Sequence, residues 1–286
     1  MRLSVVIPTY NTAEMTLVCC ASVLEALPGD AEVIVVDDGS TDDSARRIRE
    51  AFPSIVVLRQ DVNRGYSVAV NAGVAASRGD LVLLLNSDTR VMAGALDAFL
   101  DAFADEKLGV AGAQLINADG SSQWSAGPVP TMLWIVVAVS GIAPLLRPFR
   151  KRKASVAGEV GWVSGAAMAI RRRVWNEVGP LREDFRFYAQ DLDLCVRARR
   201  AGWTIRLLPN ARIEHRHGAT IARDRALPYA PDLLWLDLLT WGRGEYGDAW
   251  AHRARRAMIV AAAVRRIFAR DVAFKRGYDA LRNSSS

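Results

Sequence analysis

The first 115 residues alternate between short apolar runs rich in β-branched residues and longer amphipathic stretches. The runs expected to form strands are Leu3–Ile7, Glu32–Val36, Ile55–Leu58, Leu81–Leu85 and Val110–Leu115. The stretches expected to form helices are Ala13–Ala26, Ser44–Ala51, Tyr66–Ala76 and Ala93–Phe103. Strands that are apolar throughout are typical of a sheet covered on both faces, as in parallel sheets connected by helices. The pattern therefore predicts an α/β fold, with a mostly parallel sheet flanked by helices.

The regular pattern is lost between residues 120 and 160, where Gly and Pro are frequent. It returns with Val160–Arg171, a helix that begins near Asp191 and a strand at Thr204–Leu208. Beyond about residue 220 the chain predicts a basic helical tail, with helices that include Leu233–Trp241 and Trp250–Arg270. We therefore expect a single domain over residues 1–220, built from halves 1–115 and 116–220, and a helical tail over 221–286.

The net charge of +6 over 286 residues favours anionic partners. Aromatic residues are not interleaved with the basic clusters, so a nucleic-acid stacking surface is not expected. Cys19, Cys20 and Cys195 form no disulfide framework, which favours a reducing cytoplasm. Met1 leads directly into a predicted strand, so a secretory signal peptide is not expected.

The stretch Thr131–Leu146 is strongly apolar but contains Gly141 and Pro144. Its 16 residues fall short of the roughly 20 that a membrane-spanning helix needs. It could be core, a lid or a membrane-surface contact. Because the basic segment Arg147–Lys153 follows it and Trp250–Arg270 is also basic, peripheral binding at the inner face of an anionic membrane remains an open expectation.

Polar and acidic residues follow the predicted strands at the point where each strand ends. They are Pro8–Asn11, Asp37–Asp42, Asn63–Gly65 and Asn86–Asp88. In open α/β sheets, ligands bind beyond the carboxyl ends of the strands. A divalent cation such as Mg²⁺ lets carboxylates and phosphates share a pocket, since it binds the oxygens of both. Asp88 is the best-placed ligand, and Asp37 or Asp38 could instead accept hydrogen bonds from a nucleobase or ribose.

Several motifs occur in a characteristic order. In the N-terminal half they are Val5-Val-Ile-Pro-Thr-Tyr-Asn11, Val35-Val-Asp-Asp-Gly-Ser-Thr-Asp42, Asn63-Arg-Gly65 with Ala69, Asn71 and Gly73, and Leu84-Leu-Asn-Ser-Asp88. In the C-terminal half they are Trp162-Val-Ser-Gly-Ala-Ala167, Phe187-Tyr-Ala-Gln-Asp-Leu-Asp-Leu-Cys195, Arg199-Arg-Ala-Gly-Trp203 and His215-Arg-His-Gly218. Over residues 3–220 this series resembles the family 2 glycosyltransferases, and its second half resembles their rhamnosyltransferase-like branch.

The resemblance implies the A-type glycosyltransferase fold, with a nucleotide-sugar-binding half at 1–115 and an acceptor half at 116–220. It implies that Thr9 and Asp38 contact the base, that Arg64 approaches the diphosphate and that Asn71 lines the donor pocket. The donor expected first is dTDP-rhamnose, followed by UDP-sugars. The expected acceptor is a glycan or a lipid-diphosphate-linked molecule, and the expected pathway is cell envelope polysaccharide biosynthesis.

The resemblance also implies a divalent cation, Mg²⁺ or Mn²⁺, held by Asp88 as the last acid of an Asp-x-Asp motif. This sequence departs from that motif, since Asn86 stands in place of the first Asp. His215 aligns with a His-x-x-Gly element that supplies a further metal or diphosphate contact. His217, two residues on, also marks this element.

Asp191 matches the family's catalytic base, with Gln190 in place of the usual preceding Glu. Sugar transfer with inversion needs such a base to take the proton of the acceptor hydroxyl. The membrane spans and Gln-x-x-Arg-Trp motif of processive synthases are missing, so transfer of single sugars is expected. A nucleotidyltransferase or a dinucleotide-binding oxidoreductase is disfavoured because neither Gly-rich signature is present. A non-catalytic sugar-nucleotide-binding protein is the remaining alternative.

Overall fold

The computed structural model describes residues 1–142, 158–216, 230–268 and 272–284. The chain forms two compact units. The first unit contains residues 1–128, 153–183 and 190–217, and the second contains residues 129–152, 184–189 and 218–286. The division of the chain into domains 1–220 and 221–286 stays a prediction.

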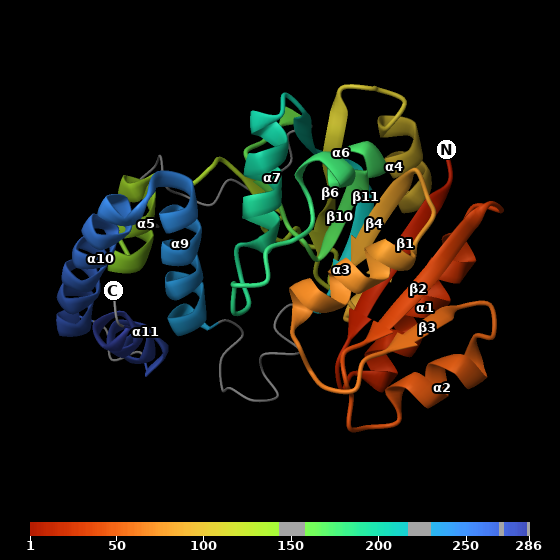
Figure 1. The fold of residues 1–286 in the computed structure, drawn as a ribbon, viewed down its shortest axis with the longest axis horizontal. Helices are drawn as coiled ribbons and strands as arrows, with labels where there is room; N and C mark the ends of the chain where they lie inside the picture. Colours follow the sequence, from red (N-terminus) through yellow and green to blue (C-terminus); the bar gives the residue numbers. More distant parts are fainter. Residues whose placement is uncertain (143–157, 217–229, 269–271, 285–286) are drawn as a thin grey trace. The chain divides into compact units, whose positions relative to one another are not determined.

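The first unit is built on a mixed β-sheet, which Figure 1 shows with its helices on both faces. Four parallel strands form one half in the order β3 (Val56–Arg59), β2 (Ala31–Asp37), β1 (Leu3–Thr9) and β4 (Leu81–Leu85). The last residue of β1 pairs with the last residue of β2, Thr9 with Asp37. The carboxyl ends of these strands therefore meet at one edge, as the sequence predicts.

The other half of the sheet contains antiparallel strands. It consists of β10 (Ala167–Arg171), β6 (Leu108–Ile116), β11 (Thr204–His215), β5 (Thr89–Val91) and β8 (Gly158–Glu159). Strand β10 runs antiparallel to both β4 and β6, whereas β11 runs parallel to β6 and antiparallel to β5. Strands β7 (Ala126–Gly127) and β9 (Trp162–Val163) form a separate pair.

Helices cover both faces because the buried strand residues alternate between two apolar clusters. Leu3, Val5 and Ile7 pack in the cluster that contains Cys20 of α1 (Ala13–Ala26), whereas Val6 packs in the other cluster with α3 (Tyr66–Ala76). The contact with α3 depends on Gly73, where an added Cβ would lie 2.4 Å from Val6 Cγ1. The helices of this unit are α1 (Ala13–Ala26), α2 (Ser44–Ala51), α3 (Tyr66–Ala76), α4 (Ala95–Ala102), α6 (Arg172–Val178) and α7 (Gln190–Arg200).

The predicted α/β fold is confirmed, and α1, α2, α3 and β4 have the expected bounds. The strand expected at Thr204–Leu208 continues to His215, with a shift in its register against β6 between Leu208 and Arg212. Proline at position 209 and the mixed residues after it conceal this continuation, because proline rarely lies inside a strand.

The described part of the second unit consists of α5 (Met132–Ser140), α9 (Pro231–Tyr246), α10 (Asp248–Phe268) and α11 (Val272–Asn283). Helix α10 packs against the other three helices. The tail helices expected around 233–241 and 250–270 correspond to α9 and α10. Arg147–Lys153 and the end of the apolar run 131–146 lie outside the described residues. Over the described ranges, no helix combines the length and the apolar character that crossing a membrane requires.

A buried carboxylate organises the second unit. Asp237 of α9 is fully buried and accepts hydrogen bonds from the backbone N–H groups of Arg186, Phe187 and Tyr188, at 2.9, 2.8 and 2.7 Å. The Tyr188 hydroxyl in turn accepts a hydrogen bond from the backbone of Ala230, just before α9. One side chain therefore satisfies three consecutive backbone donors, which few other residue types can do.

We expect Asp237→Asn to lower the free energy of unfolding by about 1–3 kcal/mol, since an amide has only one acceptor oxygen for these donors. Urea denaturation followed by tryptophan fluorescence measures this change. The control is Asp248→Asn, whose side chain is 79% exposed and should change stability by less than about 0.5 kcal/mol. Equal losses in the two variants would contradict the role of Asp237.

Candidate active site

Asp38 connects the end of β2 to the start of α3. Its carboxylate is almost fully buried and accepts hydrogen bonds from the backbone N–H groups of Arg64 (2.9 Å) and Gly65 (2.8 Å). Its own N–H donates to the backbone oxygen of Thr9 at 2.9 Å. Gly65 has φ of 96°, a left-handed conformation that favours glycine. Asp38 thereby fixes the loop that carries the exposed Arg64 side chain.

Asp37 and Thr9 lie beneath this edge of the sheet. Asp37 is fully buried, and one carboxylate oxygen accepts a hydrogen bond from the N–H of Ser40 at 3.0 Å. The Thr9 hydroxyl lies 2.8 Å from the hydroxyls of both Thr12 and Thr16. Asp37 thus stabilises the turn that follows it in the chain. Thr9 connects the end of β1 to α1. A contact of either residue with a base stays a prediction.

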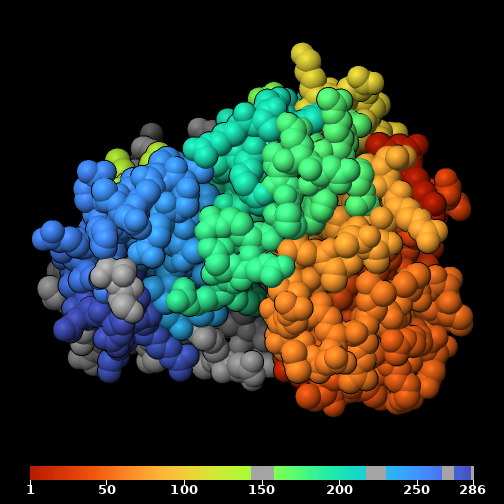
Figure 2. Space-filling view, viewed as in Figure 1, coloured from red at the N-terminus to blue at the C-terminus, as the bar shows by residue number. Residues whose placement is uncertain are grey.

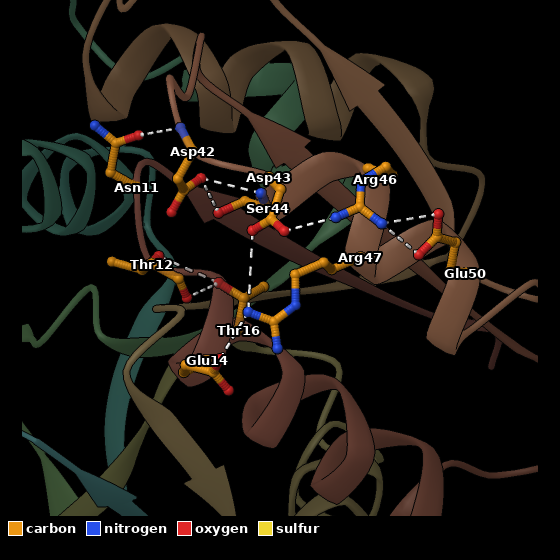
Figure 3. A network of polar contacts seen from close by, with 10 residues as sticks. All are labelled: Asn11, Thr12, Glu14, Thr16, Asp42, Asp43, Ser44, Arg46, Arg47 and Glu50. Atoms are coloured by element: carbon orange, nitrogen blue, oxygen red, sulfur yellow. Dashed lines mark hydrogen bonds and ion pairs between the residues drawn. The ribbon is translucent and has the colours of Figure 1, made fainter.

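Asn11 stabilises the loop between β2 and α2, as Figure 3 shows. Its side-chain oxygen accepts hydrogen bonds from the backbone N–H groups of Thr41 (2.8 Å) and Asp42 (3.2 Å). Asp42 accepts from the N–H of Ser44, where α2 begins. The Arg47–Glu14 ion pair then joins α2 to α1 at 2.6 Å (Figure 3). The loop between β2 and α2 is therefore held on both sides.

Asn71 connects α3 to the segment that follows α6. Its Nδ2 donates to the backbone oxygen of Leu181 at 2.9 Å, and its Oδ1 accepts from the N–H of the same residue at 2.9 Å. Nδ2 also contacts Glu183 at 3.0 Å. Figure 2 shows the surfaces of these segments, orange and green, in contact. In the structure the Asn71 amide joins α3 to the segment after α6. That Asn71 lines a donor pocket stays a prediction.

Asp88 and His215 form the pair expected to hold a cation. Both are buried, and His215 Nε2 lies 3.5 Å from Asp88 Oδ1. Two neighbouring ligands of an octahedral cation with bonds of about 2.1 Å lie about 3 Å apart, so a small movement suffices. Among the described residues, no three His, Cys, Asp or Glu side chains form a cation site. The pair therefore fits a cation that takes its other ligands from phosphate and water, as Mg²⁺ commonly does.

Burial raises the pKa of Asp88 to about 6, mainly by desolvation of the charged form. A bound cation would reverse this shift, because it stabilises the carboxylate. Asn86, the residue in place of an aspartate, is partly buried, and its backbone N–H donates to Ala166 at 3.0 Å. This hydrogen bond joins the Asp88 loop to the Gly165–Ala166 turn.

Asp191 lies on the other side of the same turn. Its Oδ2 accepts from the N–H of Gly165 at 2.9 Å, and its Oδ1 accepts from Leu192 at 2.7 Å. It lies in the first turn of α7, at a helix start as expected, and Ala189 before the helix has φ of 70°. Burial raises the pKa of Asp191 by desolvation, against the hydrogen bonds from the backbone that lower it.

The structure brings the site residues into two connected groups. Thr9, Asp37, Asp38 and Arg64 lie at the carboxyl edge of the parallel strands, and the hydroxyl of Thr12 joins this edge to Ser87 at 3.1 Å. Asn86, Asp88 and His215 join Asp191 through the Gly165–Ala166 turn. His217 lies outside the described residues.

Sequence reasoning missed Tyr66 and Gln123. The Tyr66 hydroxyl donates to the oxygen of Gly165 at 3.2 Å, and its pKa is raised by burial and by the charge of Asp191. Gln123 contacts the His215 ring at 3.0 Å from 92 positions away. The position of Tyr66 directly after Asn63-Arg-Gly65 was a usable signal, whereas nothing around Gln123 marks its role.

The first unit thus combines an α/β fold with a polar strand edge and a buried Asp–His pair. The family described as "Glycosyl transferase family 2" matches residues 4–179. The chain belongs to this family and is a glycosyltransferase.

Two relatives define its similarity further. The chain is 29% identical over 247 residues to the N-acetylglucosaminyl-diphospho-decaprenol L-rhamnosyltransferase of Mycobacterium tuberculosis, covering 78% of this chain and 79% of that protein. It is 32% identical over 204 residues to the succinoglycan biosynthesis protein ExoU of Rhizobium meliloti, covering 66% of this chain and 56% of that protein. The resemblance to the rhamnosyltransferase-like branch is thereby confirmed.

Solved structures share the fold. The mannosyltransferase PcManGT from Pyrobaculum calidifontis, in complex with GDP-Man and Mn²⁺, has a TM-score of 0.59 at 17% identity, covering 98% of this chain and 73% of that chain. S. aureus TarS 1–349 in complex with UDP-GlcNAc has a TM-score of 0.59 at 18% identity, covering 94% of this chain and 74% of that chain. At these identities the likeness concerns the fold alone.

We expect Asp38→Asn to speed amide hydrogen exchange at Arg64 and Gly65 by about 10- to 100-fold. The variant loses the charge and one of the two acceptors, and hydrogen bonds to charged groups contribute about 1.5–3 kcal/mol. Mass spectrometry of the peptide around residues 62–66 measures the rate. Asp61→Asn, an exposed change in the same loop, is the control. Unchanged exchange in Asp38→Asn would refute the clamp.

Proposed function

We propose that the protein is an inverting, non-processive glycosyltransferase that moves a sugar from a nucleotide-diphosphate donor to a hydroxyl of a glycan or lipid-linked acceptor. The observation that carries the proposal is the connection of the Asp88–His215 pair to Asp191 through the Gly165–Ala166 turn. In this proposal the Asp88–His215 pair binds the leaving diphosphate through a cation, and Asp191 takes the proton of the acceptor hydroxyl. Inversion requires these two tasks on opposite faces of the sugar.

The proposed donor is a pyrimidine nucleotide sugar, with dTDP-rhamnose first and UDP-sugars next. The relative from M. tuberculosis is named for L-rhamnosyl transfer, and its printed name includes a diphospho-decaprenol. That name supports rhamnose as the sugar and a lipid-diphosphate-linked acceptor. Asp38 and Thr9, which are proposed to contact the nucleobase, lie at the carboxyl edge of the parallel strands, and Arg64 is exposed on the adjoining loop.

In the proposed reaction, Asp191 accepts the proton of the acceptor hydroxyl while the oxygen attacks the anomeric carbon. The N–H groups of Gly165 and Leu192 orient its carboxylate. Asp88 and His215 would hold Mg²⁺ or Mn²⁺, which when bound stabilises the charge on the departing diphosphate. Arg64 and Arg216 supply further positive charge, and the backbone of Arg216 is tied to Asp88 by a hydrogen bond of 3.0 Å.

A membrane contact would suit a lipid-linked acceptor. Helix α10 exposes basic residues near its start, including Arg253 and Arg256. Further along the same helix, Val260 and Val264 are 64% and 50% exposed. Basic and apolar side chains on one helix favour an anionic bilayer surface. We therefore propose peripheral binding at the cytoplasmic face, with α10 as a contact.

Donor binding should depend on a divalent cation held by Asp88. Asp88→Ala should weaken binding by about 2–4 kcal/mol, since a charge-assisted contact to the cation is lost. Calorimetry with dTDP-rhamnose and UDP-sugars, with and without Mn²⁺, measures this loss. Asp97→Ala, a change in the first turn of α4, is the control. Full affinity in Asp88→Ala or in EDTA would reject the cation site, and no binding of any pyrimidine nucleotide sugar would reject the donor.

Asp191→Asn should lower turnover by at least about 100-fold, because general-base catalysis contributes roughly 10²–10⁴-fold. Donor affinity should barely change, whereas the free energy of unfolding should fall by about 1–3 kcal/mol, since Asn has one acceptor oxygen for the N–H groups of Gly165 and Leu192. Because burial raises the pKa of Asp191, the acidic limb of kcat/KM should lie above pH of about 4, the ordinary value. The control is Asp193→Asn, which should keep near-normal turnover. Asp193 lies on the same helix but forms ion pairs with Arg197 and Arg182, a structural role. Near-normal turnover in Asp191→Asn would show that another group is the base.

The protein should sediment with anionic vesicles and not with neutral ones. The double variant Arg253→Glu/Arg256→Glu should lose at least about ten-fold in partitioning, since each basic residue near such a surface contributes about 1 kcal/mol. Added salt should weaken the binding of the wild type. Arg199→Glu/Arg200→Glu on α7 changes the charge equally and is the control. Equal partitioning to both vesicle types would exclude this surface.

A further inference from the structure

The loop between β6 and β7 contains a chain of hydrogen bonds that ends on His215. Its members are Asp119, Ser121, Asn117 and Gln123. All of them belong to the first unit. Each side chain has a defined set of donors and acceptors, so the direction of every hydrogen bond can be deduced along the chain.

The direction is set at the carboxylate of Asp119. Hydrogen bonds from the Ser121 side chain and backbone lower the pKa of Asp119, so its oxygens only accept. The Ser121 hydroxyl therefore donates to Asp119 Oδ1, 2.6 Å away. Having used its hydrogen there, the hydroxyl accepts from Asn117 Nδ2 at 2.8 Å. The other side-chain atom of Asn117, Oδ1, is consequently an acceptor directed at Gln123.

The hydrogen-bond acceptors around Gln123 allow its side-chain amide only one orientation. Its Nε2 lies 2.8 Å from Asn117 Oδ1 and 2.7 Å from the backbone oxygen of His215. A flipped amide would oppose its oxygen to both of these oxygens. Oε1 of Gln123 is therefore the atom that lies 3.0 Å from His215 Nδ1, and Nδ1 must carry the hydrogen.

From this chain we infer that Gln123 is a positioning residue that sets the Nδ1–H tautomer of His215, so that Nε2 offers its lone pair to the cation beside Asp88. The inference rests on the proposed cation role of Asp88 and His215. Gln123 holds the histidine at two points, the ring at Nδ1 and the backbone at its oxygen. Metal-bound histidines commonly donate their second ring N–H to an oxygen acceptor, which fixes the ring and raises its basicity.

The geometry around Nε2 agrees with this role. In this tautomer Nε2 is unprotonated and lies 3.5 Å from a carboxylate oxygen of Asp88. Two electron-rich atoms at this distance are stabilised by a cation that both can bind. In the opposite tautomer, Nε2–H would instead be a hydrogen-bond donor to Asp88, and the histidine would act only in packing.

The first test reads the tautomer directly in the complete, metal-free protein. Nitrogen-15 NMR of histidine-labelled protein at pH 8 distinguishes protonated from unprotonated ring nitrogens. The chain has 3 histidines, so His217→Gln and His252→Gln assign the signals. We expect His215 in the Nδ1–H form. The Nε2–H form would overturn the inference, whatever the enzyme's activity proves to be.

The second test uses variants and the binding of Mn²⁺ with UDP, followed by the relaxation of water protons. Gln123→Met should lose the tautomer preference and about 10- to 100-fold in Mn²⁺ affinity, as expected for loss of a partner of a metal-bound histidine. Gln123→Glu keeps an acceptor for Nδ1–H and should retain the tautomer and more of the affinity than Gln123→Met, although its second oxygen opposes Asn117 Oδ1 and the His215 backbone oxygen and so lowers stability. If Gln123→Met fails to fold, the Gln123→Glu comparison and the wild-type tautomer still test the inference.

Gln114→Met is the matched control. Gln114 is a buried neighbour whose Nε2 bonds the backbone oxygen of Gln123 at 3.1 Å. Affinity kept in Gln114→Met and lost in Gln123→Met would support the role of the Oε1–Nδ1 hydrogen bond. Equal losses in both, or unchanged affinity in Gln123→Met, would overturn it. No Mn²⁺ binding by the wild type, with donor binding intact, would reject the cation role and this inference, but not the transferase.

Discussion

The parallel pairing of β1, β2 and β4 is the constraint on which the site depends. It places the ends of three strands at one edge, and a hydrogen bond from Asp38 N–H to Thr9 extends this order by one residue. The polar groups at the edge then act on the backbone. Both carboxylate oxygens of Asp38 accept hydrogen bonds from the loop before α3, and Asp37 accepts one from Ser40 in the turn that follows β2. A preformed edge of this kind lowers the ordering cost of binding a ligand.

The cation pair depends on a different part of the sheet. His215 ends β11, a strand that pairs parallel with β6 on both sides of a register shift and, after that shift, also pairs antiparallel with β5. In that pairing His215 lies opposite Thr89, the residue after Asp88. One short antiparallel contact thus brings together residues far apart in the sequence. The loop that contains Gln123 reaches the same place from the end of β6.

Local signals in the sequence predicted much of this arrangement. Apolar runs and helical periodicity located β4 and three helices, and the acidic strand ends marked the edge. The same signals could not reveal what each polar side chain contacts. Asn71 pairs with Leu181, 110 positions away, and Gln123 meets His215 across 92 positions. The clamp at Asp237 likewise joins a helix to a segment about 50 positions earlier, and no local pattern specifies such pairs.

The charges of the site also explain how Asn86 can replace an aspartate. Asp37 and Asp38 each accept a hydrogen bond from a backbone N–H group. Asp88 instead lies beside His215. Burial already raises the pKa of Asp88 to about 6. A second buried carboxylate two residues away would oppose ionisation further, since like charges in one site disfavour each other. In the proposed site His215 is the second ligand, so a neutral residue at position 86 would leave a donor set for one cation and would keep the negative charge low before the cation binds.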